Sequence, residues 1–150
     1  MPLNSKSLSP PTLLVSEIMT AGVHSIRPEM KIYEVIELLI RHHISGAPVV
    51  DHLDQVLSVV SEGDVLRLAA LEGLEATVAH CLPQLPRPKN LITVQRTQSF
   101  ADAYRLFIKH SLHRIIVVDS NGRLHGVVTR ADILRIFVEA KHGKKIKRGA

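Results

Sequence analysis

Two short motifs in this sequence have residue types and a spacing that suit ligand binding, Ser61-Glu62-Gly63-Asp64 and Thr129-Arg130-Ala131-Asp132. Each follows an apolar run typical of a strand and precedes a helical pattern, so each lies at a predicted helix N-terminus. The first backbone N–H groups of a helix have no intrahelical partners, so this position suits a polar or anionic ligand. The same Ser/Thr-x-x-Asp spacing is close to a capping box, in which the side chains satisfy those N–H groups. Ligand binding and capping are both open at this point.

Both motifs belong to an internal repeat. When the sequence is shifted by 68 positions, residues 26–68 align with residues 94–136 without a gap. A repeat of this length indicates two copies of one supersecondary unit rather than a solenoid. Identical pairs across the two copies include Val49/Val117, Asp51/Asp119, Asp64/Asp132 and Arg67/Arg135.

The two copies show the same order of patterns. A short extended segment (23–26 and 91–94) precedes a helix with an apolar stripe, and a β-branched strand follows (47–50 and 115–118). A turn, another strand and a final helix complete a β-α-β-β-α unit. A unit of about 50 residues is too small to cover both faces of its sheet. We therefore expect an α/β (α+β) fold in which the two repeats pack as one pseudo-two-fold module.

Composition and motif positions divide the chain into five segments. We expect a flexible N-terminal arm at 1–14, the first repeat at 15–70, a connector at 71–90, the second repeat at 91–138 and a basic tail at 139–150. The connector can be helical in its first half. Its proline-rich second half is expected to be extended, because proline disfavours helix.

The net charge of +5 comes from the C-terminal end. Five of the 19 Lys and Arg residues lie within 141–150, and the 14 that remain balance the 14 acidic residues. No apolar run approaches the roughly 20 residues of a membrane span, and no signal peptide is evident. The single cysteine, Cys81, excludes an internal disulfide. A cytoplasmic protein without a membrane partner is expected.

Taken together, these features resemble a cystathionine-β-synthase (CBS) domain pair, also called a Bateman module. The resemblance covers roughly residues 15–138 and rests on the duplicated unit, the two Ser/Thr-x-x-Asp motifs, Ile18-Met19-Thr20 and the stretch 44–51. It implies a regulatory module that binds AMP, ADP, ATP or S-adenosylmethionine in clefts between the repeats. It also implies homodimers, no obligatory cofactor and an effector protein still to be identified.

The resemblance also assigns roles to individual residues. Asp132 and Asp64 would accept hydrogen bonds from the two hydroxyls of a ribose, a geometry that their spacing permits. The polar residues assigned to phosphate are Thr129, Ser61, His113, Arg114 and Arg130. The apolar residues assigned to adenine are Ile26, Ala47, Pro48, Ile92, Val94, Ile115 and Ile116.

The copies depart from the family pattern in a few places. Pro86-Arg87-Pro88 aligns with Ile18-Met19-Thr20, and Ser58 aligns with Gly126, the residue usual in the family. Gly63 also lowers helix propensity at the first motif. We therefore expect the site at Asp132 to be better formed than the site at Asp64.

Other classes of function find less support. The histidines, such as His42-His43 and His110 with His113, lack Cys or carboxylate partners at the spacing of a tetrahedral site, so no metal is predicted. No nucleophile with a base and no Gly-x-x-x-x-Gly-Lys loop is recognisable, so we expect no enzyme. Two alternatives remain. One is association with nucleic acid through the tail, and the other is a structural dimerisation module with empty clefts.

Overall fold

The computed structural model describes residues 12–143, which form two compact units. The N-repeat unit comprises Val23–Ile92 and Ser120–Leu124. The C-repeat unit comprises the described residues up to Gly22, Thr93–Asp119 and the described residues from His125. Most of the predicted arm (1–11) and of the predicted basic tail (144–150) lies outside the described residues.

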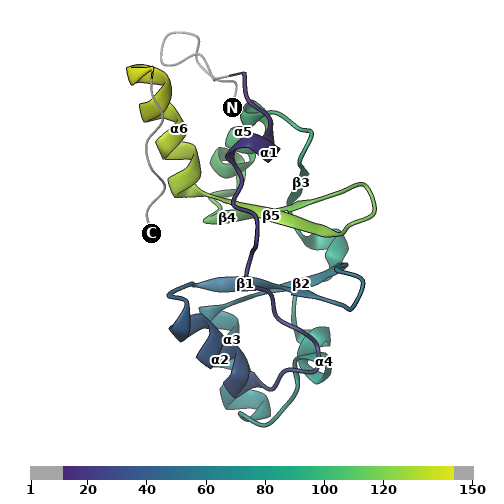
Figure 1. Cartoon of the computed structure of the whole chain (residues 1–150). Coiled ribbons are helices and arrows are strands. Elements are labelled where there is room, and N and C mark those ends of the chain that lie inside the picture. The colour runs from purple at the N-terminus through teal and green to yellow at the C-terminus, as the bar shows by residue number, and fades with distance from the viewer. Residues whose placement is uncertain (1–11, 144–150) are drawn as a thin grey trace. The chain divides into compact units, whose positions relative to one another are not determined.

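The N-repeat unit places two helices on one face of a two-stranded sheet (Figure 1). Its elements are α2 (Ile32–Arg41), β1 (Gly46–Val50), β2 (Val56–Ser61) and α3 (Glu62–Glu72). Strands β1 and β2 are antiparallel, and the predicted leading strand is reduced to a single parallel bridge between Ile26 and Val49. The apolar stripe of α2 packs into a core that includes Ile26, Val49, Val60 and Leu68.

The C-repeat unit repeats this arrangement with a fuller sheet of order β3-β4-β5. Its elements are β3 (Thr93–Gln95), α5 (Phe100–His110), β4 (Arg114–Val118), β5 (Leu124–Thr129) and α6 (Arg130–His142). Strand β3 pairs with β4 in parallel, and Phe100 lies at the centre of the core with no exposed surface. The expected α/β (α+β) class with two tandem repeats is confirmed. Helix α6 continues to His142, so the first residues expected in the tail are helical.

A short helix at the N-terminus, α1 (Val15–Ile18), packs against α5 and α6 of the C-repeat unit. The backbone N–H of Val15 donates to the carbonyl of Gln98 over 2.7 Å. Val15 and Ile18 are both fully buried in the C-repeat core. The helix that precedes the first repeat in the sequence therefore completes the core of the second.

Helix α4 (Val78–Cys81), in the connector, has the equivalent role in the N-repeat unit. The N–H of Val78 donates to the carbonyl of Met30 over 2.8 Å, and Met30 aligns with Gln98 in the repeat. Val78 and Cys81 are buried like Val15 and Ile18. The structural counterpart of α1 is thus α4, and not Pro86-Arg87-Pro88 as the ungapped alignment predicts.

The first half of the connector is less helical than the sequence predicts, and its second half is more helical. Helix α3 ends before Gly73, which adopts a φ of 86°, so only part of the first half is helical. Two 3-10 turns, η1 (Leu82–Gln84) and η2 (Pro88–Asn90), interrupt the stretch that we expected to be extended. Proline fits at the start of such turns because the first N–H groups of a helix need no partner within it.

One carboxylate holds the connector to α3. Oε1 of Glu72 accepts a hydrogen bond from Gln84 Nε2 over 2.6 Å, and Oε2 lies 3.0 Å from His80 Nε2. These hydrogen bonds, that of Gln84 above all, lower the pKa of Glu72 below its ordinary value of 4.5. A carboxyl whose pKa falls on folding stabilises the protein above its unfolded-state pKa. That contribution is lost as the pH falls through the folded-state pKa.

We therefore expect Glu72→Gln to flatten the acid side of the stability profile. The free energy of unfolding of the wild-type protein should fall more steeply than that of E72Q below about pH 4.5, as urea denaturation at a series of pH values would show. Glu29→Gln is the matched control, since Glu29 is exposed and its carboxylate makes no hydrogen bond or ion pair with another described residue. Parallel profiles for E72Q and the wild type would contradict this account.

Candidate ligand-binding site

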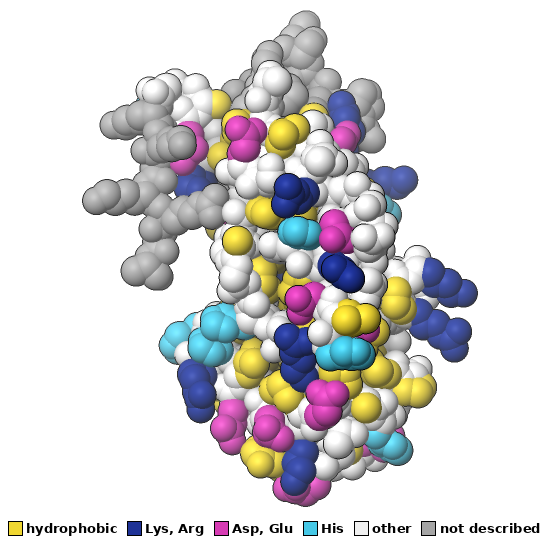
Figure 2. Space-filling view, turned by 45° about the vertical axis from the view of Figure 1, so that its right-hand side comes forward, with side chains coloured by type: hydrophobic (Ala, Val, Ile, Leu, Met, Phe, Trp, Pro, Cys, Tyr) yellow, Lys and Arg dark blue, Asp and Glu magenta, His cyan; other side chains and the backbone are white. Residues whose placement is uncertain are grey.

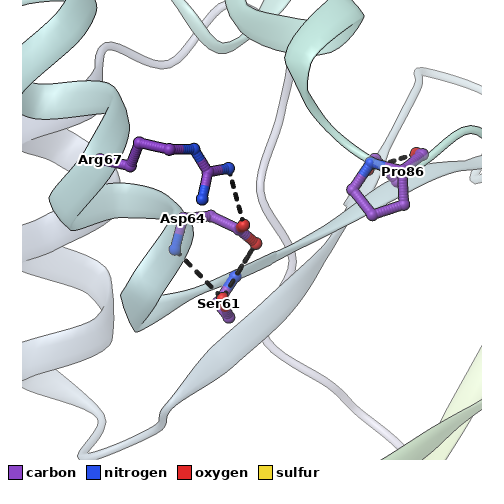
Figure 3. A network of polar contacts seen from close by, with 5 residues as sticks. Ser61, Asp64, Arg67 and Pro86 are labelled. Atoms are coloured by element: carbon purple, nitrogen blue, oxygen red, sulfur yellow. Dashed lines mark hydrogen bonds and ion pairs between the residues drawn. The ribbon is translucent and has the colours of Figure 1, made fainter.

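The first Ser/Thr-x-x-Asp motif lies where β2 runs directly into α3. The Oδ2 atom of Asp64 accepts hydrogen bonds from the backbone N–H and the hydroxyl of Ser61, both over 2.9 Å. Ser61 Oγ in turn accepts the N–H of Asp64 over 3.2 Å. On the other side of the carboxylate, Oδ1 lies 3.1 Å from Arg67 Nη2 (Figure 3). Ser61 and Asp64 therefore form a capping box, and Arg67 adds an ion pair.

The second motif repeats this geometry between β5 and α6. Asp132 Oδ2 accepts the N–H of Thr129 over 2.9 Å, and Thr129 Oγ1 accepts the N–H of Asp132 over 3.2 Å. Asp132 Oδ1 lies 2.6 Å from Arg135 Nη2. The Asp132 side chain is 5% exposed, against 21% for Asp64. The carboxylate that the sequence favours as ligand-binding is thus the less accessible of the two.

At each corner, the point where a strand runs into a helix (β2 into α3, β5 into α6), the aspartate carboxylate can accept further hydrogen bonds. A carboxylate offers about four lone-pair positions, and the cap and the arginine use two at Asp132 and three at Asp64. A ligand hydroxyl can therefore bond to the remaining positions without displacing the whole network. Each corner also holds one arginine beside a helix N-terminus, a combination that favours an anionic group.

Arg67 and Arg135 were not predicted to have a role in the site. A signal for them exists in the sequence, because both copies carry an arginine three residues after the aspartate. Residues three apart on a helix lie on the same face, so this spacing places the guanidinium beside the carboxylate.

The capping box alone does not identify a site. Helix α5 begins with Ser99-Phe100-Ala101-Asp102, where Asp102 accepts the N–H of Ser99 over 3.3 Å and lies 3.5 Å from Arg105. This third copy of the pattern follows a turn, whereas the motifs at Asp64 and Asp132 follow a strand of the sheet. The corner position, repeated in both units, is what distinguishes the two candidate sites.

The phosphate candidates of the second repeat gather near the start of α6. Arg130 donates from Nε to the carbonyl of Leu112 over 2.5 Å and from Nη2 to the carbonyl of Ser111 over 3.0 Å. Its backbone N–H donates to the carbonyl of His113 over 3.2 Å. The Arg130 side chain therefore donates its hydrogen bonds to backbone carbonyls of the loop after α5. His113 is exposed and Arg114 is half-buried at the start of β4.

The adenine candidates divide into two groups. Four are side chains of the two hydrophobic cores: Ile26 and Ala47 in the N-repeat unit, and Val94 and Ile115 in the C-repeat unit. Pro48 and Ile116 alternate with core residues along β1 and β4, so they lie on the opposite faces of these strands, where both are buried, and Ile92 is half-buried. This second group lies outside the two core clusters.

Within residues 12–143, no three His, Cys, Asp or Glu side chains come together as they would around a metal ion. No helix in that range has the length and apolar character needed to cross a membrane.

Comparison with known proteins agrees with these features. A family model of the CBS domain matches residues 15–71 and 85–139. Protein MJ1232 of Methanocaldococcus jannaschii is 29% identical over 127 residues, which are 85% of this chain and 40% of that protein. CBSX2, a chloroplastic CBS domain-containing protein of Arabidopsis thaliana, is 25% identical over 85% of this chain and 64% of its own length. The chain thus spans less than two thirds of either relative.

Two solved structures resemble the fold. The crystal structure of CBSX2 in complex with AMP matches with a TM-score of 0.73 and 25% identity, covering 85% of this chain and 98% of that one. The CBS domain pair of protein MJ0100, in complex with 5-methylthioadenosine and S-adenosyl-L-methionine, matches with a TM-score of 0.68 and 25% identity, covering 83% and 99%. With both repeats matched by the family model, this chain belongs to the CBS domain family.

Proposed function

We propose that this protein is a regulatory module that binds an adenosine-containing ligand at its two strand-to-helix corners. The observation that carries the proposal is the repetition of one arrangement, a capped aspartate with an arginine one turn later, in both units. Family members with the same fold contain AMP, or 5-methylthioadenosine and S-adenosyl-L-methionine. These ligands share a ribose, and the acceptor positions that stay free, about two at Asp132 and one at Asp64, suit its hydroxyls.

The remaining parts of the ligand follow from the same placement. Phosphates, where the ligand has them, would meet the hydroxyls of Ser61 and Thr129, the imidazole of His113 and the positive charge of Arg114. The base would contact Pro48, Ile92 and Ile116, which are not members of the two hydrophobic core clusters. A cleft shared by the two repeats stays a prediction from the resemblance.

Titration calorimetry with AMP, ADP, ATP and S-adenosylmethionine tests the proposal. We expect heat with at least one of them, together with a rise in melting temperature that grows with ligand concentration. Asp132→Ala or Asp64→Ala should weaken binding at least about tenfold, because the substitution removes the acceptors for the ribose hydroxyls. The loss of each cap should cost up to about 2 kcal/mol of stability.

Asp102→Ala is the matched control for both substitutions. It removes the same kind of cap and arginine contact from α5, so it should lower stability without changing ligand affinity. If D102A lost as much ligand affinity as D64A or D132A, the weaker binding of those two variants would be a consequence of lower stability and not of a lost ligand contact. No heat and no thermal shift with any of the four ligands, at protein concentrations of about 100 micromolar, would remove the proposal.

The finer predictions from the sequence belong to the same proposal. The module is non-enzymatic, pairs as a homodimer, acts in the cytoplasm and transmits ligand occupancy to an effector protein. Binding changes such a partner only if the ligand favours one arrangement of the module, by about 1–3 kcal/mol. The basic tail that motivated the nucleic-acid alternative lies mostly outside the described residues. On the face drawn in Figure 2, basic side chains are interspersed with acidic ones.

A further inference from the structure

The two corners differ in how accessible their ion pairs are. Where β2 runs into α3, the Asp64 side chain is 21% exposed and that of its partner Arg67 is 50% exposed. Where β5 runs into α6, the Asp132 side chain is 5% exposed and that of its partner Arg135 is 15% exposed. The spacing of aspartate and arginine is the same at both corners, so the difference comes from the surroundings of each pair.

A second carboxylate lies beside Arg135. The Nη2 atom of Arg135 is 2.6 Å from Oδ1 of Asp132, and its Nε atom is 3.9 Å from Oε1 of Glu139. Glu139 is 18% exposed and lies one turn further along α6, so the three side chains share one face of this helix. In α3 the position four residues after Arg67 is occupied by Leu71, which is apolar and exposed. Only the arginine of the C-repeat corner has a carboxylate at this spacing.

The ion pair restricts the access of a ligand to Asp132. About two acceptor positions of this carboxylate are unused, but a side chain that is 5% exposed offers almost no surface to a ligand hydroxyl. Oδ2 is held by the backbone N–H of Thr129, so the carboxylate cannot turn outwards without losing its cap. Arg135 is attached through a long, flexible side chain and is the group that can move. Ligand binding at Asp132 therefore requires a shift of Arg135.

We propose that Arg135 is a latch that closes the Asp132 corner, and that Glu139 receives the guanidinium when a ligand binds. In the closed state Arg135 bonds to Oδ1 of Asp132. In the open state it pairs with Glu139 alone, and the two hydroxyls of a ribose bond to Asp132 in its place. The charge of Arg135 is paired in both states, so opening avoids the cost of leaving a half-buried charge without a partner.

The latch lowers the affinity of this corner for its ligand. When the corner is open in only a fraction of the molecules, the apparent dissociation constant is the intrinsic one divided by that fraction. A substitution that destabilises the closed state should therefore tighten binding, and one that destabilises the open state should weaken it. A residue that only contacts the ligand, or only supports the fold, would not give these opposite signs.

Titration calorimetry of Arg135→Met tests the closed state. Asp64→Ala is present in every chain compared, so that only the Asp132 corner remains. Methionine keeps a long side chain without a hydrogen-bond donor, so R135M should bind AMP at least about tenfold more tightly. S-adenosylmethionine should show the same gain, because it carries a ribose and no phosphate. Unchanged affinity, or a loss with AMP alone as expected of a phosphate contact, would overturn the latch.

Arg67→Met is the matched control at the other corner. It is measured in chains that carry Asp132→Ala, so that only the Asp64 corner remains. The pair of Arg67 and Asp64 is more exposed than the pair in α6, so its removal should change affinity by less than about twofold. An equal gain in R67M would show that the loss of any arginine beside the aspartate tightens binding, and would refute a role for Glu139.

Glu139→Gln tests the open state and leaves the pair of Arg135 and Asp132 in place. It removes the charge that receives Arg135, so binding at the Asp132 corner should weaken at least about threefold. In the double variant with Arg135→Met this effect should disappear, because Glu139 acts through Arg135. An effect of E139Q that is equal with and without R135M would overturn the proposal.

This inference rests on the proposed function, since it concerns access to one of the two corners. Urea denaturation of each variant shows whether it is folded at the temperature of the titration. If R135M does not fold, E139Q still tests the latch. No heat with AMP or S-adenosylmethionine in any chain would remove the proposed function and the latch with it. Heat in the parent chain, with R135M no tighter or E139Q no weaker, would overturn the latch alone.

Discussion

Replacing Gly126 by alanine is expected to lower the free energy of unfolding by about 2–4 kcal/mol. A Cβ atom at this position would lie 2.7 Å from the carbonyl oxygen of Thr20 and 2.9 Å from the sulfur of Met19. Thr20 exchanges two backbone hydrogen bonds with Val127, of 2.8 and 3.0 Å. The methyl group must therefore push away the segment that connects α1 to the rest of the chain. Urea denaturation monitored by circular dichroism measures the effect.

Gly63→Ala provides a control with the same chemical change and the opposite expected sign. A Cβ at Gly63 would meet only Ser61 Oγ, at 3.8 Å, and the residue lies in the first turn of α3. Alanine is favoured over glycine in a helix by about 0.5–1 kcal/mol, so G63A should stabilise the protein. If G126A were neutral or stabilising as well, the close approach of Thr20 to Gly126 would not contribute to the effect of substitutions on stability.

Phe100→Ala should be the most destabilising single substitution considered, at about 3–5 kcal/mol. The ring is fully buried in the C-repeat core. It lies 5.4 Å, centroid to centroid, from Phe137 in an edge-to-face contact and 6.1 Å from Tyr104 in a stacked one. Removing it leaves a cavity and forfeits both aromatic contacts.

Two measurements distinguish this loss from a general effect of truncation. Leu71→Ala removes an exposed apolar side chain from α3 and should change stability by less than about 0.5 kcal/mol. Hydrogen exchange of F100A should show more lost protection in α5 and β4 than in α2, because the cavity lies in the C-repeat core. Uniform loss across both units would contradict a local defect.

The repeated elements were predictable because their signals are local. The stripe of Ile32, Val35 and Leu39 marks one buried face of α2, and the β-branched runs mark β1 and β4. Duplication strengthened each prediction, since the same pattern occurred twice. The capping alternative at Ser61 and Thr129 was also readable, because a cap depends on residues three apart.

Features that depend on contacts far apart in the sequence were not predictable. Nothing local in Val15–Ile18 shows that this helix packs with residues beyond position 92, nor that Val78–Cys81 is its counterpart. The pattern Ser99-x-x-Asp102 shows why the ligand-binding site could not be predicted from residue spacing alone. The same four-residue pattern forms a cap there without a preceding strand, so the spacing alone cannot distinguish a cap from a ligand corner.

The packing of α1 has a consequence for synthesis on the ribosome. Helix α1 is translated before the other described helices and strands, yet the core that buries Val15 and Ile18 is complete only after α6 has been made. Chains are synthesised at about 5–20 residues per second, so these apolar residues stay uncovered for several seconds. The contiguous stretch Val23–Ile92 contains most of its unit and can form before then. Nascent chains in which residues 23–92 have left the ribosome but α6 has not should therefore carry one folded unit and an exposed apolar segment that a chaperone can bind.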